Sequence, residues 1–449
     1  MKINILLSMV VMGNLYANTI EEDLMGFDDL SVQVEQKSTD IMDGFDDENT
    51  SKITEEKTQL IEGLTGKFIE QVAYSCNGTA PHDNLTSFKS SLFLDYEHKF
   101  ENGFKMKVNA KAYYDAVYDL KDENYSQDEL DELRSEVELF DAYVEGSITE
   151  KLDVKLGRQV VVWGRSDTIR VTDVLNPLDN RRPGMVDIED LRLPVAMAKF
   201  DYFIGDWRVT PIAVLEQRFS KNPPYASAFY PAPFALPEED KYTGATYALS
   251  IGGEFSGWDV NFYGARLHDD VGYVSMLGKP SIKHDKVTMF GTALNALSGA
   301  WLFKTELAYF DGLKYTSTQK KEFSRTDALI GVEYKGIADT MIGYDISRRH
   351  FNRYDTRLLN EVSALEQDTY QHAFRVSSDF MNATLTVNYL ISLYGKKLDE
   401  GGFQRAWVKY ELAEGVNMNV GIVDYIGGST LFDAIKDNDL VFADISYSF

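Results

Sequence analysis

Cysteine and long apolar runs are scarce in this chain of 449 residues, and each scarcity excludes a class of protein. Cys76 is the only cysteine, so no disulfide can form within the chain and a disulfide framework is excluded. After residue 12 no stretch approaches eighteen uninterrupted apolar residues, which excludes membrane-spanning helices. Cations are also few, with 45 Lys and Arg against 71 Asp and Glu, so no nucleic-acid-binding face is expected.

Catalytic and metal-binding motifs are missing as well. The six histidines form no H-E-x-x-H motif or Cys/His cluster. The sequence also holds no G-x-S-x-G nucleophile motif and no phosphate-binding glycine loop. These absences predict a protein that is not an enzyme and that has no cofactor or metal site.

The N-terminus has the order of features that is typical of a secretory signal peptide. Lys2 precedes a largely apolar run over residues 3–12, and the small residue Ala17 follows. The run is too short to cross a membrane as a helix. We therefore expect residues 1–17 to be removed after export, and the mature chain to begin near Asn18.

Residues 18–62 are predicted to form an acidic periplasmic arm. Up to residue 62 the chain holds fourteen acidic residues and only four lysines, and it contains two similar pieces at residues 25–29 and 43–47. Low hydrophobicity and repulsion between like charges favour disorder or a short helix over a packed domain. The paired aspartates miss the spacing of a calcium-binding loop. A solvated arm that contacts a periplasmic partner is the role that we expect.

From residue 63 to residue 449, apolar and polar residues alternate with a period of two. The even positions from Phe104 to Ala116 are apolar, for example, and most of the odd positions between them are polar. Such alternation is typical of strands with one face toward lipid and the other toward water. We count eighteen candidate strands, with sixteen as the alternative. Three of the eighteen are expected at residues 104–120, 152–164 and 207–220.

The candidate strands are joined in a regular order. Very short turns, such as residues 101–103 and 413–415, join every even strand to the next odd strand, and long connections fall at the other end. Outer-membrane barrels have this asymmetry, with tight periplasmic turns, long extracellular loops and an even strand number. We therefore predict an all-β, transmembrane, antiparallel barrel in the bacterial outer membrane, surrounded by its lipid and with both termini in the periplasm.

The C-terminal strand predicts how the barrel is assembled. Alternate residues from Val441 to Phe449 are apolar, and most of the residues between them are polar. A terminal Phe on such a strand resembles the signal that the outer-membrane assembly machinery recognises. Tyr447 and Phe449 are therefore the candidate assembly residues, and this machinery is an expected partner. An ordinary edge strand that ends the chain is the alternative.

One stretch resembles a known family. Residues 156–164 read LGRQVVVWG, and residues 176–179 read NPLD. This is similar to the LGRQ-x3-WG segment and the following N-P-x-D element of the barrel family named domain of unknown function 1302. The likeness is strongest over residues 140–202, and the layout of the remaining chain is compatible. It implies an outer-membrane channel, in a family often linked to uptake or export of hydrophobic compounds, and it brings no catalytic residues.

The loop at residues 165–193 is the candidate constriction of that channel. It carries both charge signs, and its prolines cannot continue a strand ladder. Such length is typical of functional loops, and folded into the barrel it would set the width and charge of the pore. An external cap held by Arg–Asp pairs is the alternative. The candidate selectivity residues are Arg165, Asp167, Arg170, Asp173, Asp179, Arg181, Arg182 and Asp187.

A second connection, residues 221–242, is rich in proline and aromatic residues. Exposed apolar surface on an external loop is costly unless it covers or binds something. We expect a stiff apolar entrance, with Tyr225, Phe229, Tyr230 and Phe234 as its candidate residues. Packing of these rings into the barrel mouth or the interfacial girdle is the alternative.

Together these features predict an outer-membrane channel for small hydrophobic or amphipathic solutes. A general porin for small polar solutes is the alternative within transport. An outer-membrane hydrolase built on residues 268–270 and a plugged structural or adhesion barrel are the alternatives outside transport. No motif supplies the nucleophile that such a hydrolase needs.

Overall fold

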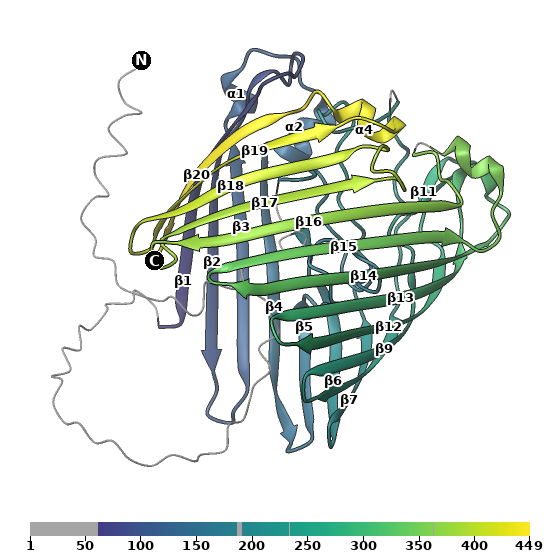
Figure 1. Ribbon diagram of the computed structural model, residues 1–449. Helices are drawn as coiled ribbons and strands as arrows, with labels where there is room; N and C mark the ends of the chain where they lie inside the picture. Colours follow the sequence, from purple (N-terminus) through teal and green to yellow (C-terminus); the bar gives the residue numbers. More distant parts are fainter. Residues whose placement is uncertain (1–61, 186–190, 233, 362) are drawn as a thin grey trace.

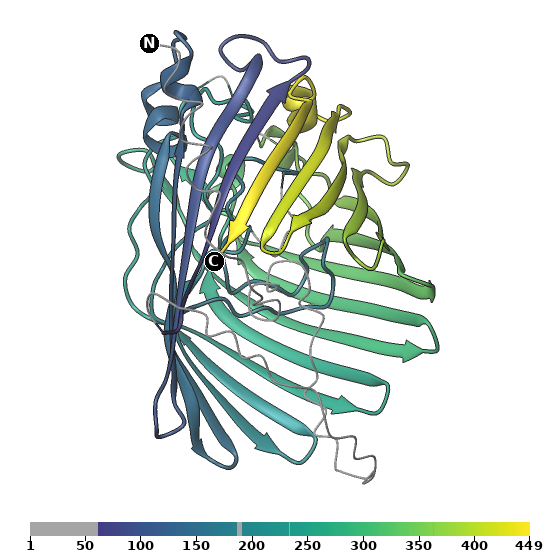
Figure 2. The ribbon, with the colours of Figure 1, turned by 90° about the vertical axis from the view of Figure 1, so that its left-hand side faces the viewer.

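The protein forms a closed antiparallel barrel of eighteen strands (Figure 1). The computed structural model describes residues 62–185, 191–232, 234–361 and 363–449, so the predicted signal peptide and all but the last residue of the predicted arm lie outside the described residues. β1 (Leu64–Ser75) pairs with β2 (Asn84–Lys99) on one side and with β20 (Leu440–Ser448) on the other, which closes the barrel (Figure 2). The predicted count of eighteen strands is confirmed.

The first half of the barrel runs from β1 to β9. Its further strands are β3 (Lys105–Asp115), β4 (Ser135–Thr149), β5 (Leu152–Gln159), β6 (Val195–Ile204), β7 (Trp207–Val214), β8 (Thr246–Phe255) and β9 (Trp258–His268). Two short helices, α1 (Val117–Leu120) and α2 (Gln127–Leu133), lie between β3 and β4. A small hairpin of β10 (Tyr273–Ser275) and β11 (Ser281–Lys283) follows β9 and lies outside the barrel sheet.

The second half begins with β12, which pairs with β9. Its strands are β12 (Lys286–Ser298), β13 (Trp301–Leu313), β14 (Phe323–Ile337), β15 (Thr340–Phe351), β16 (Asp368–Phe380), β17 (Leu385–Tyr394), β18 (Gly402–Ala413), β19 (Val416–Ile426) and β20. Short helical turns lie in three of the connections: η2 (Thr316–Thr318), η3 (Thr356–Asn360) and α4 (Thr430–Ile435). Among the described residues, no helix is long and apolar enough to cross a membrane.

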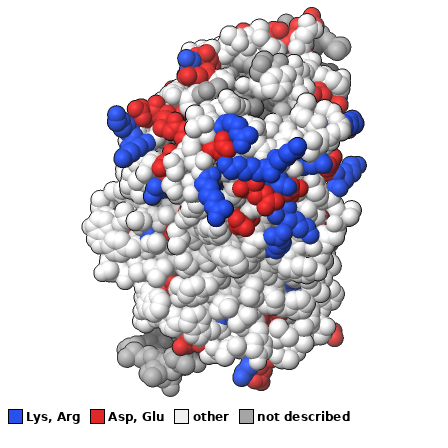
Figure 3. Space-filling view, turned by 90° about the vertical axis from the view of Figure 1, so that its right-hand side faces the viewer, with Lys and Arg blue, Asp and Glu red and all other residues white. Residues whose placement is uncertain are grey.

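The wall has an apolar outer face, and β13 shows the alternation that produces it. The odd residues from Trp301 to Tyr309 are exposed, and the even residues from Lys304 to Phe310 are buried inside the barrel. Lipid-facing positions of transmembrane barrels are apolar in this way. Figure 3 shows Lys, Arg, Asp and Glu gathered over the upper part of one face and few charges over the lower part. The protein is therefore an outer-membrane β-barrel, as the sequence predicted.

Strand β5 ends at Gln159, although the sequence predicted a strand as far as residue 164. Side chains of the following loop take the place of a neighbouring strand. The Val161 N–H donates to the side-chain oxygen of Asn176 at 2.8 Å, and the Trp163 N–H donates to the carboxylate of Asp173 at 3.3 Å. The chain leaves the sheet because these local acceptors satisfy its backbone.

Two other strands are also shorter than predicted. The strand expected at residues 207–220 ends at Val214, where the N–H groups of Leu215 and Glu216 both bond to the Ala196 carbonyl and the ladder stops. The strand expected at residues 104–120 ends at Asp115, and helix α1 begins two residues later.

Candidate functional site: the barrel lumen

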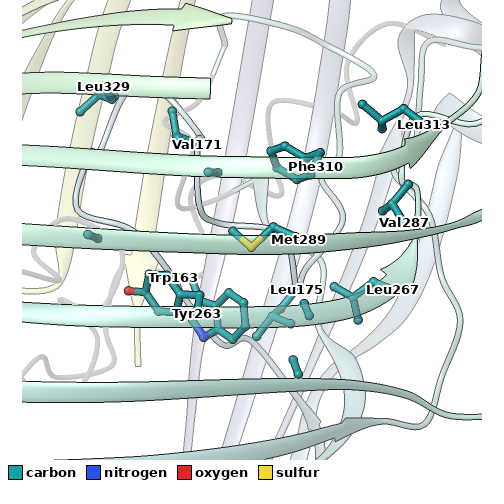
Figure 4. Close-up of a cluster of buried hydrophobic side chains, with 14 of the residues drawn as sticks. Trp163, Val171, Leu175, Tyr263, Leu267, Val287, Met289, Phe310, Leu313 and Leu329 are labelled. Carbon is teal, nitrogen blue, oxygen red and sulfur yellow. The ribbon is translucent and has the colours of Figure 1, made fainter. Parts of the chain in front are cut away.

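The described residues of the connection between β5 and β6, residues 160–185 and 191–194, lie inside the barrel, and we call them the inner segment. Its residues Trp163, Val171 and Leu175 pack in one buried cluster with inward-facing residues of β6, β8, β9, β12 and β13 (Figure 4). The Trp163 ring stacks on Tyr263 of β9, with 4.5 Å between ring centroids. Because these wall residues face away from the lipid, the inner segment occupies the lumen.

Glu306 of β13 holds the start of the inner segment, and its side chain is 2% exposed. One carboxylate oxygen accepts the N–H groups of Arg165 at 2.6 Å and Ser166 at 3.0 Å. The other accepts the N–H of Thr172 at 3.0 Å and its hydroxyl at 2.7 Å. Gly164 has φ +92°, and a Cβ there would lie 2.9 Å from the same carboxylate. Four donors thus compensate one buried charge, and a glycine permits the close approach.

Two more charges of the inner segment bind the same side of the wall. The guanidinium of Arg165 bonds to Asp259 of β9. The carboxylate of Asp167 accepts a hydrogen bond of 2.9 Å from Lys304, which is buried on β13. Both candidate selectivity residues therefore have a wall residue of opposite charge as partner.

Three charged residues of the inner segment, Arg170, Asp173 and Arg192, bind one another. Asp173 is buried, and its carboxylate accepts a hydrogen bond of 2.9 Å from Arg192 and lies 3.3 Å from the Nε of Arg170. Arg170 also donates to the carbonyls of Asp173 and Asn176, at 2.9 and 2.7 Å. The Arg–Asp pairs that the cap alternative predicted do occur, but they lie inside the barrel.

Residues 179–182 of the inner segment bind the opposite wall, at β3 and β4. Arg181 donates to Glu136 at 2.7 Å and to Asp179 at 2.6 Å, and Arg182 donates to the fully buried Asp115 at 2.9 Å. Burial alone would raise the pKa of Asp179, but the hydrogen bond and charge of Arg181 outweigh burial and hold this pKa below its ordinary value. The inner segment therefore crosses the lumen from β9 and β13 to β3 and β4.

Seven of the eight candidate selectivity residues are thus placed, and the eighth, Asp187, lies outside the described residues. Each of the seven is paired with an opposite charge. Sequence reasoning missed the wall partners Glu306, Asp259, Glu136 and Asp115. The alternation along β13 puts Glu306 on the inner face, but nothing in the sequence names the residues that it binds.

The four candidate entrance residues differ in their surroundings. Phe229 packs against Tyr425 of β19, with ring centroids 5.3 Å apart, and Tyr225 meets Tyr230 edge-on at 5.5 Å. Phe234 remains 56% exposed. Phe229 therefore packs against a buried cluster that includes Tyr425, whereas the Phe234 ring is exposed.

The candidate assembly residues lie at the seam between β1 and β20. The N–H and carbonyl of Phe449 both bond to Gly66 of β1, at 2.9 and 2.8 Å. The Tyr447 and Phe449 rings lie 6.0 Å apart. A Cβ at Gly66 would lie 2.4 Å from the Phe449 ring, so the glycine makes room for the terminal aromatic.

Residues 268–270, considered as a hydrolase site, make contacts between loops. The Asp270 carboxylate accepts the N–H and hydroxyl of Ser220 at 2.8 and 2.6 Å, and the His268 ring bonds to the carbonyl of His284 at 2.5 Å. These contacts tie the loop after β7 to the loop after β9.

Comparison with solved structures shows the same fold in other outer-membrane proteins. The chain is similar to OccAB3 of Acinetobacter baumannii (12% identity, TM-score 0.52, covering 86% of this chain and 98% of that one). It is also similar to a BenF-like porin from Pseudomonas fluorescens Pf-5 (12% identity, TM-score 0.53, 86% and 97%). Among curated proteins no significant match is found. A family model described as "Protein of unknown function (DUF1302)" matches residues 77–449, and the chain therefore belongs to this family.

Proposed function

We propose that the protein is a channel for small hydrophobic or amphipathic molecules, with the inner segment as its constriction. The course of this segment across the lumen, from Glu306 on one wall to Asp115 on the other, carries the proposal. Rings of uncompensated charge select ions and polar solutes in pores. The seven described candidate selectivity residues are all paired instead, which supports a solute that is largely apolar.

The domain arrangement and partners follow from the same proposal. Residues 1–17 act as the signal peptide, residues 18–62 as the periplasmic arm and residues 63–449 as the barrel. The exposed Phe234 supports an apolar entrance on the extracellular side. The assembly machinery would act on the terminal strand, and the acidic arm would contact a periplasmic partner.

A permeation test with the purified full chain in liposomes distinguishes the alternatives. Benzenesulfonate and isethionate carry the same charge and neither crosses lipid readily, but only the first is amphipathic. We expect the protein to pass benzenesulfonate faster than isethionate. Equal or faster passage of isethionate would favour a general porin, and passage of neither would favour a plugged barrel.

A further inference from the structure

The wall of the barrel is uneven in height at its extracellular end. β4 has fifteen residues, whereas β5 and β7 have eight each. β4 pairs with β3 as far as Ser135, but it pairs with β5 only as far as Ala142. Residues 135–141 of β4 therefore have no strand beside them on the β5 side. At about 3.3 Å per residue, this leaves a notch roughly 20 Å high above β5–β7. In Figure 2 the teal strands end well below the tops of the blue strands.

Ion pairs that involve residues of the loop after β7 close this notch. We call the five residues Glu138, Arg158, Glu216, Arg218 and Lys221 the latch. Glu138 of β4 lies 2.9 Å from the Lys221 ammonium and 2.5 Å from the Arg218 guanidinium. Arg158 donates to both oxygens of Glu216, at 3.1 and 2.5 Å, and to the Leu139 carbonyl on the free edge of β4 at 2.6 Å.

The residues between Arg218 and Lys221 reach the far side of the notch. The Phe219 ring stacks on His284 with 3.5 Å between ring centroids, and Ser220 bonds to Asp270 in the loop after β9. Residues 218–221 thus link β4 to the connection between β9 and β12. Above β5–β7, this short loop closes the wall in place of a backbone ladder. Side chains join it to β4 and to the loop after β9, and the Lys221 backbone bonds to Leu178 and Asn180 of the inner segment.

Apolar residues lead from the lumen to the outer surface at this place. Trp163 and Val214 belong to the buried cluster of the lumen. Their chain neighbours are Val162, three residues after the end of β5, and Leu215, directly after the end of β7, and they are 48% and 56% exposed. On the other rim of the notch, Val137 of β4 is 84% exposed. An apolar solute would meet apolar surface on both sides of the latch.

We propose that the notch is a lateral portal, through which an apolar solute passes between the lumen and the outer leaflet, with the latch as its gate. The portal rests on the proposed function, because a lateral route serves only a solute that prefers lipid to water. Opening an ordinary barrel wall would leave backbone N–H and C=O groups unsatisfied in lipid. Of the latch contacts, the one from Arg158 to the Leu139 carbonyl involves the backbone, so opening the latch frees one backbone carbonyl and not a strand ladder. It also spares the solute the transfer of its apolar surface into water.

A reversible cross-link tests the portal on the folded protein. In a Cys76→Ala background, Glu138→Cys and Lys221→Cys are joined after assembly by a short, reducible, thiol-specific cross-linker. The control joins Arg348→Cys and Asp368→Cys, which replace an exposed ion pair of 2.7 Å where β15 and β16 form an unbroken wall. Heat-modifiable gel mobility checks that all variants are folded. The probes are N-phenyl-1-naphthylamine uptake by intact cells and isethionate and benzenesulfonate permeation in liposomes.

The expected result is a several-fold slower uptake of the apolar dye when the latch is cross-linked, recovery on reduction, unchanged sulfonate permeation and no effect of the control cross-link. Dye uptake that depends on the protein but ignores the latch cross-link would overturn the portal and leave the proposed function standing. Equal slowing of dye and sulfonates would also overturn it, because the cross-link would then be obstructing the axial path. Absence of protein-dependent dye uptake, together with no preference for benzenesulfonate, would reject the proposed function and the portal with it.

Discussion

The barrel wall and the inner segment are held by different interactions. The wall is a closed ladder of backbone hydrogen bonds, which continues across the seam between β1 and β20. The described part of the inner segment has only two isolated bridges, at Leu178 and Asp179, and otherwise depends on side chains such as Glu306 and Arg181. The wall should therefore be sensitive to loss of closure, and the inner segment to the loss of single side chains.

Deletion of Phe449 is expected to have the largest effect, because it removes the residue that completes the seam. Both backbone groups of Phe449 bond to Gly66, and its ring fills the space beside this glycine. We expect the assembled barrel to be strongly reduced and export to the periplasm to be intact. Heat-modifiable gel mobility of fractionated membranes measures the assembled form, with Ser448→Ala as control. An undiminished folded band would show that the terminal aromatic is not the assembly signal.

Replacement of Glu306 by Ala is the sharpest test of the inner segment. It leaves the four donors of Arg165, Ser166 and Thr172 without their acceptor, at a cost of about 1–3 kcal/mol for each group that stays buried and unpaired. We expect the barrel to fold, the start of the segment to detach, and the channel to become noisier and more conductive. Single-channel recording in planar bilayers measures this. Thr305→Ala, on the lipid-facing side of the same strand, is the control, and a wild-type trace from Glu306→Ala would contradict the anchoring role.

The sequence predicts the wall well because the signals of a wall are local. The alternation of polar and apolar residues and the length of each turn depend on residues that are neighbours in the sequence. The structure has both features. The end of β5 was mispredicted because a run of valines has the pattern of a strand. The side chain of Asn176, fifteen residues further on, binds the N–H of Val161 instead, and that of Asp173, ten residues further on, binds the N–H of Trp163.

The contacts of the inner segment cannot be predicted from residues that are neighbours in the sequence. Length and mixed charge suggested a loop in the lumen, but the partner of Arg165 on β13, Glu306, lies 141 residues away in the sequence. Such a pair is set by the closure of the barrel and by the register of every strand between them. A single sequence indicates which residues of β13 face inward, but it does not indicate which loop residues bind them.

Charges of the inner segment are expected to affect ion preference more than charges on an external loop. Replacing Arg181 and Arg182 by Ala leaves the wall carboxylates Glu136 and Asp115 without these partners, so the channel should shift toward cations. Charges in a narrow, partly dehydrated lumen act at low effective dielectric, whereas loop charges are screened within a Debye length of about 8 Å. The comparison is the same double change at Lys320 and Lys321.

Reversal potentials and conductance of both double variants in planar bilayers measure this difference, after heat-modifiability has shown that both are folded. Lys321 bonds to Asp355 in a neighbouring external loop at 2.8 Å, so the control also breaks an ion pair. Equal effects of the two double changes would mean that position inside the barrel does not matter. No effect of the arginine changes would mean that residues 181 and 182 lie off the solute path.

Acid is expected to have the smallest effect, and only at low pH. Folding holds the pKa of Asp179 below its ordinary value of 3.8, chiefly through Arg181 acting against burial. A carboxyl group with a lowered pKa stabilises the folded state fully above its ordinary pKa, and this contribution is lost as the pH falls through the lowered pKa. The contact between Arg181 and Asp179 should therefore be unchanged from neutral pH to about pH 5 and weaken only below 3.8.

Single-channel noise at neutral pH, at mildly acidic pH and below pH 3.8 checks this expectation. Asp179→Asn is the matched variant, because its amide cannot titrate and no longer attracts the Arg181 guanidinium as an ion. It should show at neutral pH the added noise that the wild type shows only in strong acid, and its noise should not change further through this carboxyl's range. If the wild-type channel already became noisier between neutral pH and about pH 5, a group other than Asp179 would control the noise, because this carboxylate stays ionised there.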